Sequence, residues 1–124
     1  MPFTPDIAID DATPTEVNFN FISNVGSKTI RKDPARDVDS PRVMTISHEV
    51  SGKGSSAVDR HLLRFDQTEV DPNDDSSIAT ASAHVVLTMP RKNITNAMML
   101  DLAAFITNYL VEANIEKLLN GEPG

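Results

Sequence analysis

The 124-residue chain contains no cysteine and no tryptophan, and its single tyrosine is Tyr109. Without cysteine there is no disulfide framework, no thiolate zinc site and no cysteine nucleophile. With so few aromatic rings, the hydrophobic core must be built from Ile, Val, Leu and Met together with the five Phe residues. We therefore expect a fold that depends on aliphatic packing and has no covalent cross-links.

Long apolar runs and targeting segments are also missing. The longest apolar stretch, 97–111, is interrupted by Asp101, Thr107 and Asn108, so it is a poor candidate for a bilayer-spanning helix. The first ten residues contain two prolines and lack the basic-then-apolar order of a secretory leader. These absences predict a soluble, intracellular protein without a membrane partner.

Common catalytic motifs are absent as well. The chain contains no HExxH, GxSxG, P-loop or GxGxxG motif, and its three histidines are His48, His61 and His84. We expect no catalytic residues, no cofactor and no metal. The enzymatic alternative is a metal hydrolase that combines His84 with the acidic segment 71–77, and it predicts loss of activity on Asp74→Ala.

Size and charge narrow the class of protein further. A length of 124 residues predicts one domain, and 40% hydrophobic with 23% charged residues is ordinary for a globular protein. The net charge of −7 argues against general nucleic-acid binding, because phosphate neutralisation supplies most of such affinity. A basic surface confined to one face is still compatible with this balance, so the placement of the Lys and Arg residues matters more than their sum.

Runs of alternating apolar and polar residues predict an antiparallel sheet. The predicted strands span 6–10, 16–22, 43–50, 57–70 and 80–89. The first two would form a hairpin, and after a turn at 24–26 the segment 28–31 would extend its second strand. Pro90 ends the last strand because proline cannot donate a hydrogen bond to a strand ladder. The segment 33–41 is predicted to be a loop or a short edge segment, and 71–77 is predicted to be an acidic loop.

The longer predicted strands each have one polar and one apolar face, since alternate residues of a strand share a face. The polar face of the resulting sheet would carry Thr45, Ser47, Glu49, Arg60, Arg64, Thr80, Ser82, His84 and Thr88. Hydroxyl, guanidinium and imidazole groups bind phosphates, sugars and base edges, but a merely solvated sheet face has the same composition. His48 and His61 fall on the apolar side, as core histidines or as interface groups.

The C-terminal third predicts a long helix that is apolar around most of its circumference. Asn93 is a suitable N-cap, the helical pattern runs from Ile94 to Leu110, and a shorter helix is expected at 113–119. The polar positions of this pattern form one narrow stripe of Asp101, Asn108 and Glu112. Such a helix has more apolar surface than one contact with its own sheet can cover.

The surplus apolar surface predicts a homodimer. Each few hundred Å² of exposed apolar area is unfavourable by several kcal/mol at about 25 cal/mol per Å², so a second copy is expected to cover it. The predicted interface residues are Met98, Met99, Leu102, Phe105, Ile106 and Tyr109. In the alternative, both helices pack on their own sheet, and Met98 and Met99 fill gaps in the core.

The order of these elements resembles the coat protein of single-stranded RNA bacteriophages, the levivirus family. The likeness covers nearly the whole chain and is most specific from Thr80 to Leu119, where a strand ending in Thr88-Met89-Pro90 precedes the apolar helix. It implies one α+β domain over residues 1–124. In that domain a hairpin and first strands at 1–31 and main strands at 42–90 are followed by helices at 93–120 that clasp a partner chain.

The resemblance also implies a structural, non-enzymatic function. Homodimers would assemble into an icosahedral capsid around single-stranded genomic RNA, in the virion and, during assembly, in the bacterial host cytoplasm. The polar sheet face would line the interior and bind an RNA hairpin, which represses translation of the replicase. The RNA-binding residues implied are Thr45, Ser47, Arg60, Arg64, Ser82 and His84.

Individual positions follow from the same resemblance. Thr45 and Ser47 match positions that contact an adenine pocket, and Arg60 and Arg64 lie on the strand where the family carries a lysine and a threonine. Ser82 and His84 fall where a familiar member has a base-stacking tyrosine and an asparagine.

The acidic segment would meet its own copies around the symmetry axes of the shell. Asp71, Asp74 and Asp75 would repel one another there unless a cation lay between them, and the alternative is a solvated acidic turn.

A different class of protein also fits the sequence. It is a small dimeric β-sheet module that binds a ligand on the polar face or a peptide at the sheet edge.

Overall fold

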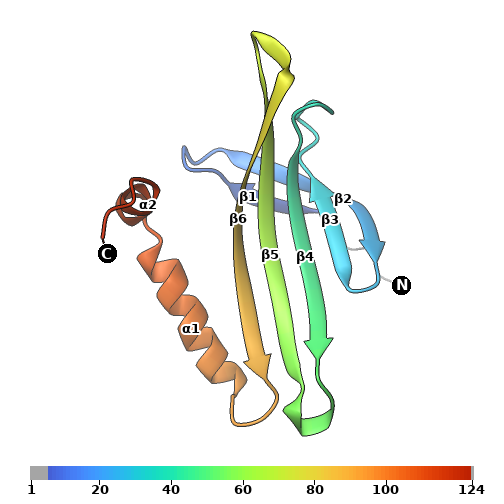
Figure 1. Cartoon of the computed structure of the whole chain (residues 1–124), viewed down its shortest axis with the longest axis vertical. Helices are drawn as coiled ribbons and strands as arrows, with labels where there is room; N and C mark the ends of the chain where they lie inside the picture. Colours follow the sequence, from blue (N-terminus) through green and yellow to red (C-terminus); the bar gives the residue numbers. More distant parts are fainter. Residues whose placement is uncertain (1–5, 124) are drawn as a thin grey trace.

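The computed structural model describes residues 6–123, so the parts of the predicted domain at residues 1–5 and 124 lie outside the described residues. Six antiparallel strands follow one another across a sheet in sequence order, and two helices come after them (Figure 1). The elements are β1 (Ile7–Asp10), β2 (Glu16–Val25), β3 (Lys28–Lys32), β4 (Arg42–Ser51), η1 (Gly54–Ser56), β5 (Val58–Asp71), β6 (Asp74–Pro90), α1 (Asn96–Tyr109) and α2 (Glu112–Leu119). This arrangement confirms the predicted α+β fold class.

The first hairpin is confirmed, but the expected extension at 28–31 is wrong. Val25 pairs with Lys28, so the chain reverses at Gly26 and Ser27 and Lys28–Lys32 forms a separate strand, β3, between β2 and β4. Gly26 has a φ of 60°, which glycine adopts without strain and which suits a two-residue hairpin turn. The turn predicted at 24–26 lies at Gly26 and Ser27, and it starts a new strand instead of continuing β2.

The β1–β2 hairpin crosses behind the upper part of the sheet in Figure 1. It is held there by an edge-on contact between the rings of Phe19 and Phe65, whose centroids are 5.5 Å apart. Phe19 is 4% exposed, as is Met44 on β4, and Ala57 is 1% exposed. Within residues 6–123 these are the buried apolar residues, so the hydrophobic core of a single chain is very small.

The predicted acidic loop at 71–77 is wrong, because most of it belongs to a long β5–β6 hairpin. Asp71 pairs with Asp74 around a turn at Pro72 and Asn73, and β6 continues to Pro90 as predicted. The Asp71 and Asp74 carboxylates accept hydrogen bonds from nearby backbone N–H groups, at 2.9 Å from Asn73 and 3.1 Å from Ser76. The hairpin end is exposed, so no apolar alternation marked it as strand.

The predicted helix start at Asn93 is also wrong. Asn93 has a φ of 71°, a left-handed conformation that asparagine tolerates better than most residues. The N-cap is Thr95, whose hydroxyl accepts a hydrogen bond from the Met98 N–H at 3.3 Å. Asn93 therefore turns the chain after Pro90, and α1 begins two residues later than predicted.

Neither helix buries a residue in the described chain. α1 makes slight contact with β6 at most, and Figure 1 shows both helices standing away from the sheet. The alternative in which the helices pack on their own sheet is therefore wrong for this chain by itself. The apolar surface of α1 remains open to solvent.

Arg91, in the turn between β6 and α1, is anchored to the start of β5. Its backbone N–H donates to the Ala57 carbonyl at 3.1 Å, and its guanidinium donates to both carboxylate oxygens of Asp59, at 3.0 and 3.1 Å. This hydrogen bond is the main cause that lowers the pKa of Asp59, and it raises the pKa of Arg91. A bidentate pair of this kind fixes orientation as well as distance.

Replacing Asp59 by asparagine is expected to loosen the start of α1. The Arg91 amide, bonded to Ala57, should exchange its hydrogen several-fold faster in Asp59→Asn than in the wild type, while Asp101→Asn on α1 should leave it unchanged. Because the pKa of Asp59 is lowered, its stabilising effect is present above about pH 4 and is lost as the pH falls further. Equal exchange rates in Asp59→Asn and the wild type would contradict this role.

Candidate nucleic-acid interface

All six predicted RNA-binding residues lie on one face of the sheet. The register aligns Thr45 with Arg64 and Arg64 with His84 across β4, β5 and β6. Residues an even number of positions away along the same strands share this face, which adds Ser47, Arg60 and Ser82. We call these six residues the polar platform. The sequence pattern placed every member of it on the correct side.

The platform is hollowed beside β3. A cavity of about 410 Å³ is lined by Thr45, Ser47 and Arg64 and by their neighbours Ser27, Lys28, His48, Glu49, Leu62 and Asp66. Thr45 and Ser47 are half-buried, whereas Arg64 and Lys28 are exposed at the rim. The arrangement presents hydroxyl donors at the bottom of a shallow hollow and cationic groups above it.

Two lysines beside the platform were missed by the sequence prediction. Lys28 pairs with Ser47 and Lys32 pairs with Val43, so both side chains lie on the face of the platform. They were missed because 28–31 was assigned to the preceding strand. The sequence did contain a signal, since Lys28, Ile30 and Lys32 alternate with Thr29 and Arg31. Only the β3–β4 register shows which face the two lysines share.

Cations outnumber carboxylates on this face. Between the Val43–Asp66 and Glu49–Arg60 pairs, β3 to β6 carry four cationic residues and two carboxylates, an excess of two positive charges on a chain of net charge −7. Asp66 offsets part of this charge, because its oxygens accept hydrogen bonds from Arg64 Nε at 3.0 and 3.1 Å. The surface is therefore locally basic, but only moderately.

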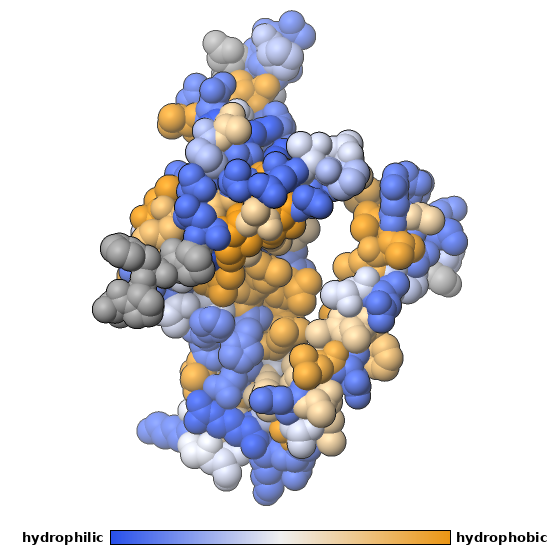
Figure 2. All heavy atoms as spheres, turned by 180° about the vertical axis from the view of Figure 1, so that it is seen from behind, coloured by the Kyte–Doolittle hydropathy of each residue, from blue (hydrophilic) through white to orange (hydrophobic). Residues whose placement is uncertain are grey.

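The opposite face of the sheet is largely apolar, with Arg42 and Asp59 toward its ends. Met44 and Ile46 on β4, Leu63 and Phe65 on β5 and Val85 on β6 share it through the register. Figure 2 views the molecule from behind and shows hydrophobic side chains gathered on the middle of this face, with further hydrophobic patches on the separate helical arm. His48 and His61 lie on the same face, as predicted, and directly oppose each other.

The predicted interface residues on α1 are largely open to solvent. Phe105 is 68% exposed, Leu102 52%, Tyr109 49%, Met98 48% and Ile106 37%, and Met99 is intermediate. Exposed apolar side chains on this scale are unusual for a soluble monomer and mark an interaction surface. The open helix and the open apolar face are complementary in character.

The chain was compared with known proteins. No protein-family model matches the sequence, and no curated protein does. Solved structures do match in fold. The virus-like particle of bacteriophage AVE019 aligns at a TM-score of 0.72 and 16% identity, covering 100% of this chain and 99% of that chain. The particle of Beihai levi-like virus 21 aligns at 0.71 and 13% identity, covering 99% and 98%.

The coat protein of bacteriophage EMS014 aligns at a TM-score of 0.69 and 15% identity, covering 88% of this chain and 74% of that chain. This chain has the fold of levi-like phage coat proteins. The agreement extends over nearly the whole chain and includes the two C-terminal helices. The predicted resemblance is confirmed at the level of the fold.

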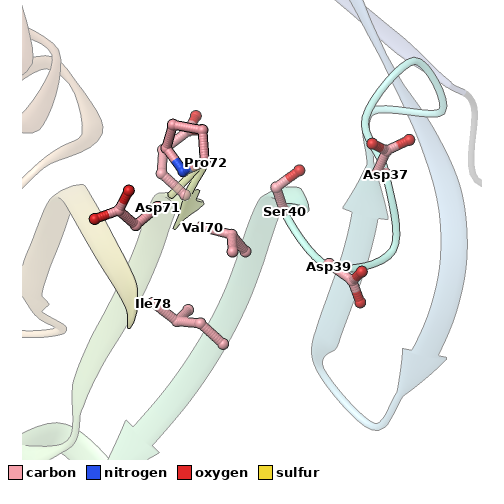
Figure 3. Close-up of a pocket in the computed structure, with 8 residues that line it drawn as sticks. Asp37, Asp39, Ser40, Val70, Asp71, Pro72 and Ile78 are labelled. Atoms are coloured by element: carbon pink, nitrogen blue, oxygen red, sulfur yellow. The ribbon is translucent and has the colours of Figure 1, made fainter. Parts of the chain in front are cut away.

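In this coat fold, a second hollow lies between the β5–β6 hairpin and the connection from β3 to β4. It has a volume of about 520 Å³, and its lining includes Asp37, Asp39, Glu69 and Asp71. Figure 3 shows Asp37 and Asp39 on the β3–β4 connection, across from Asp71 near the hairpin end. The pKa of Glu69 is lowered chiefly by a 2.6 Å hydrogen bond from Arg36.

This acidic hollow does not amount to a metal site. Among the side chains of residues 6–74 and 76–123, no three His, Asp or Glu groups lie close enough together to hold an ion. A cation between copies of the 71–77 segment therefore stays a prediction. Likewise, neither helix of the described coat fold is long and apolar enough to cross a membrane.

Proposed function

We propose that this chain is a structural coat protein of one domain that forms homodimers, which assemble into an icosahedral shell around single-stranded RNA. The structural neighbours support this proposal, because they are phage coat proteins and subunits of virus-like particles. The proposed role is non-enzymatic. It places the protein in the virion and, before assembly, in the cytoplasm of a bacterial host.

The observation that carries the proposal is the unburied helical arm. α1 and α2 bury no residue, yet apolar residues cover much of their surface. At about 25 cal/mol per Å², even a few hundred Å² of such surface favours association by several kcal/mol. Each helical arm is proposed to lie over the apolar sheet face of the partner, with Met98, Met99, Leu102, Phe105, Ile106 and Tyr109 at the interface.

The polar platform is proposed to face the RNA. Lys28, Lys32, Arg60 and Arg64 supply charge for phosphates, while Thr45 and Ser47 supply hydroxyl groups for sugars and base edges. Ser82 has no ring on which a base can stack, and His84 has a small one. The proposal is therefore packaging of RNA mainly through its backbone, and repression of the replicase through one hairpin stays a prediction.

Expression of the chain alone tests this function. The product should sediment as a closed particle, absorb as a mixture of protein and nucleic acid, and protect its RNA from added nuclease. Particles that are first opened with high salt and then treated with nuclease serve as the unprotected control. A product that elutes as a dimer without nucleic-acid absorbance would contradict the proposal and favour the small binding module.

A further inference from the structure

On the apolar face of the sheet, two histidines form a polar contact that the proposed coat function does not use. Nδ1 of His48 on β4 lies 2.8 Å from Nδ1 of His61 on β5. The two residues oppose each other in the register, their ring centroids are 5.0 Å apart, and their planes meet at 69°. The centroid distance is close to the sum of the nitrogen contact and two ring radii, so the two nitrogens point nearly straight at each other.

A contact of this geometry holds one hydrogen. One neutral imidazole donates from its Nδ1–H, and the other accepts at a bare Nδ1. The donor ring can take up a proton on its other nitrogen without disturbing the contact. If the acceptor ring is protonated as well, two N–H groups of two cations face each other at 2.8 Å, and the rings must separate.

The surroundings do not supply a counter-charge for the second proton. Leu87 on β6 opposes His61, and the next pair along β4 and β5 is Val50 with Asp59. The Asp59 carboxylate feels the charge of His61, but Arg91 already binds both of its oxygens. The other charged groups near the pair belong to the polar face of β3, β4 and β5 and are Lys28, Glu49 and Arg60.

We propose that the His48–His61 pair is an acid-sensitive latch on the apolar face. In the closed pair the rings bind each other and hold at most one positive charge between them, so a second copy can pack against this part of the face. As the pH falls toward 5, both imidazoles become cationic, the rings part, and two charges appear on the packing surface. The involvement of a second copy rests on the proposed function, whereas the latch itself lies within one chain.

The sign of the effect follows from proton linkage. An unfolded chain binds a proton on each imidazole as the pH falls through the ordinary histidine range, at about 6.5. The closed pair binds only one, so the unfolded or separated state binds more protons. Over the pH range in which the second proton binds, stability and association therefore decrease as the pH falls.

The test is to measure dissociation of the wild type and three variants from pH 7.5 to 5.0 by sedimentation velocity, with EDTA present to exclude bridging metals. The dimer dissociation constant of the wild type should rise at least about tenfold between these limits. A tenfold rise corresponds to the uptake of one proton on dissociation over one pH unit. His48→Gln and His61→Gln should each remove most of that rise. Thr88→Gln, an exposed position on the opposite face and outside the polar platform, should behave as the wild type.

A wild type that associates equally at both limits, or a Thr88→Gln variant that matches His48→Gln, would overturn the proposal. Imidazole nitrogen NMR of the wild-type chain gives a second reading that does not depend on assembly or on the variants folding. Two well-separated protonation steps for His48 and His61 are expected, and independent titration of both would reject the latch. Failure to dimerise at pH 7.5 would instead contradict the proposed function.

Discussion

Phe105→Asp is expected to abolish dimers and particles. Phe105 is the most exposed of the predicted interface residues on α1, at 68%. A phenylalanine offers about 150–250 Å² for burial, so covering its exposed part stabilises a dimer by about 3 kcal/mol per copy. Because the dimer is two-fold symmetric, this loss occurs twice. Each of the two apolar contacts also receives a carboxylate. The dimer dissociation constant should rise at least about 10³-fold.

The matched control for this variant is Asn108→Asp. It adds the same charge to the same helix, but on the polar stripe, and should leave the dimer intact. Sedimentation velocity and native mass spectrometry distinguish monomer, dimer and particle. The interface assignment would be wrong if Phe105→Asp dimerised as tightly as the wild type. A wild-type chain that is a folded, soluble monomer at micromolar concentration would contradict the proposed dimer, in which each helical arm covers the partner.

Arg60→Ala combined with Arg64→Ala is expected to lower the RNA content of the particles while dimers still form. The two substitutions remove two of the four cationic residues that the sheet carries on the polar face. Each lost phosphate contact reduces the dependence of single-strand binding on the logarithm of salt concentration by about 0.7. The slope should therefore fall by about 1.4, and binding at low salt should weaken markedly. The measurements are the ratio of absorbance at 260 and 280 nm for purified particles and the salt dependence of oligonucleotide binding to dimers.

The charge-matched control is Lys53→Ala combined with Lys92→Ala. These lysines lie in the β4–β5 connection and in the turn before α1, away from the polar platform, so removing the same total charge there should change RNA content little. RNA content that is unchanged in the arginine variant, or equally reduced in both variants, would reject the platform as the inner surface. Loss of the dimer only in the arginine variant would show a structural role for these residues.

Local patterns in the sequence determined the parts of this protein that depend on a single element. Alternation along β4, β5 and β6 placed Thr45, Arg64 and His84 on one face, because the two-residue period of a strand does not depend on its neighbours. Pro90 marked the end of β6 for an equally local reason, its missing N–H. The apolar circumference of α1 was visible in the same way, and it is the basis for predicting a partner chain.

Only the tertiary structure decided what lies beside what. Gly26 turned Lys28 and Lys32 onto a strand of their own next to β4, and the β5–β6 pairing drew an exposed acidic segment into a hairpin without any hydrophobic signal. The facing of His48 and His61 depends on cross-strand register, which turn geometry sets over distances that residue periodicity does not reach. The sequence alone therefore determined the faces of the strands and the apolar helix, whereas the fold decided the charge of the platform and the pairing of the two histidines.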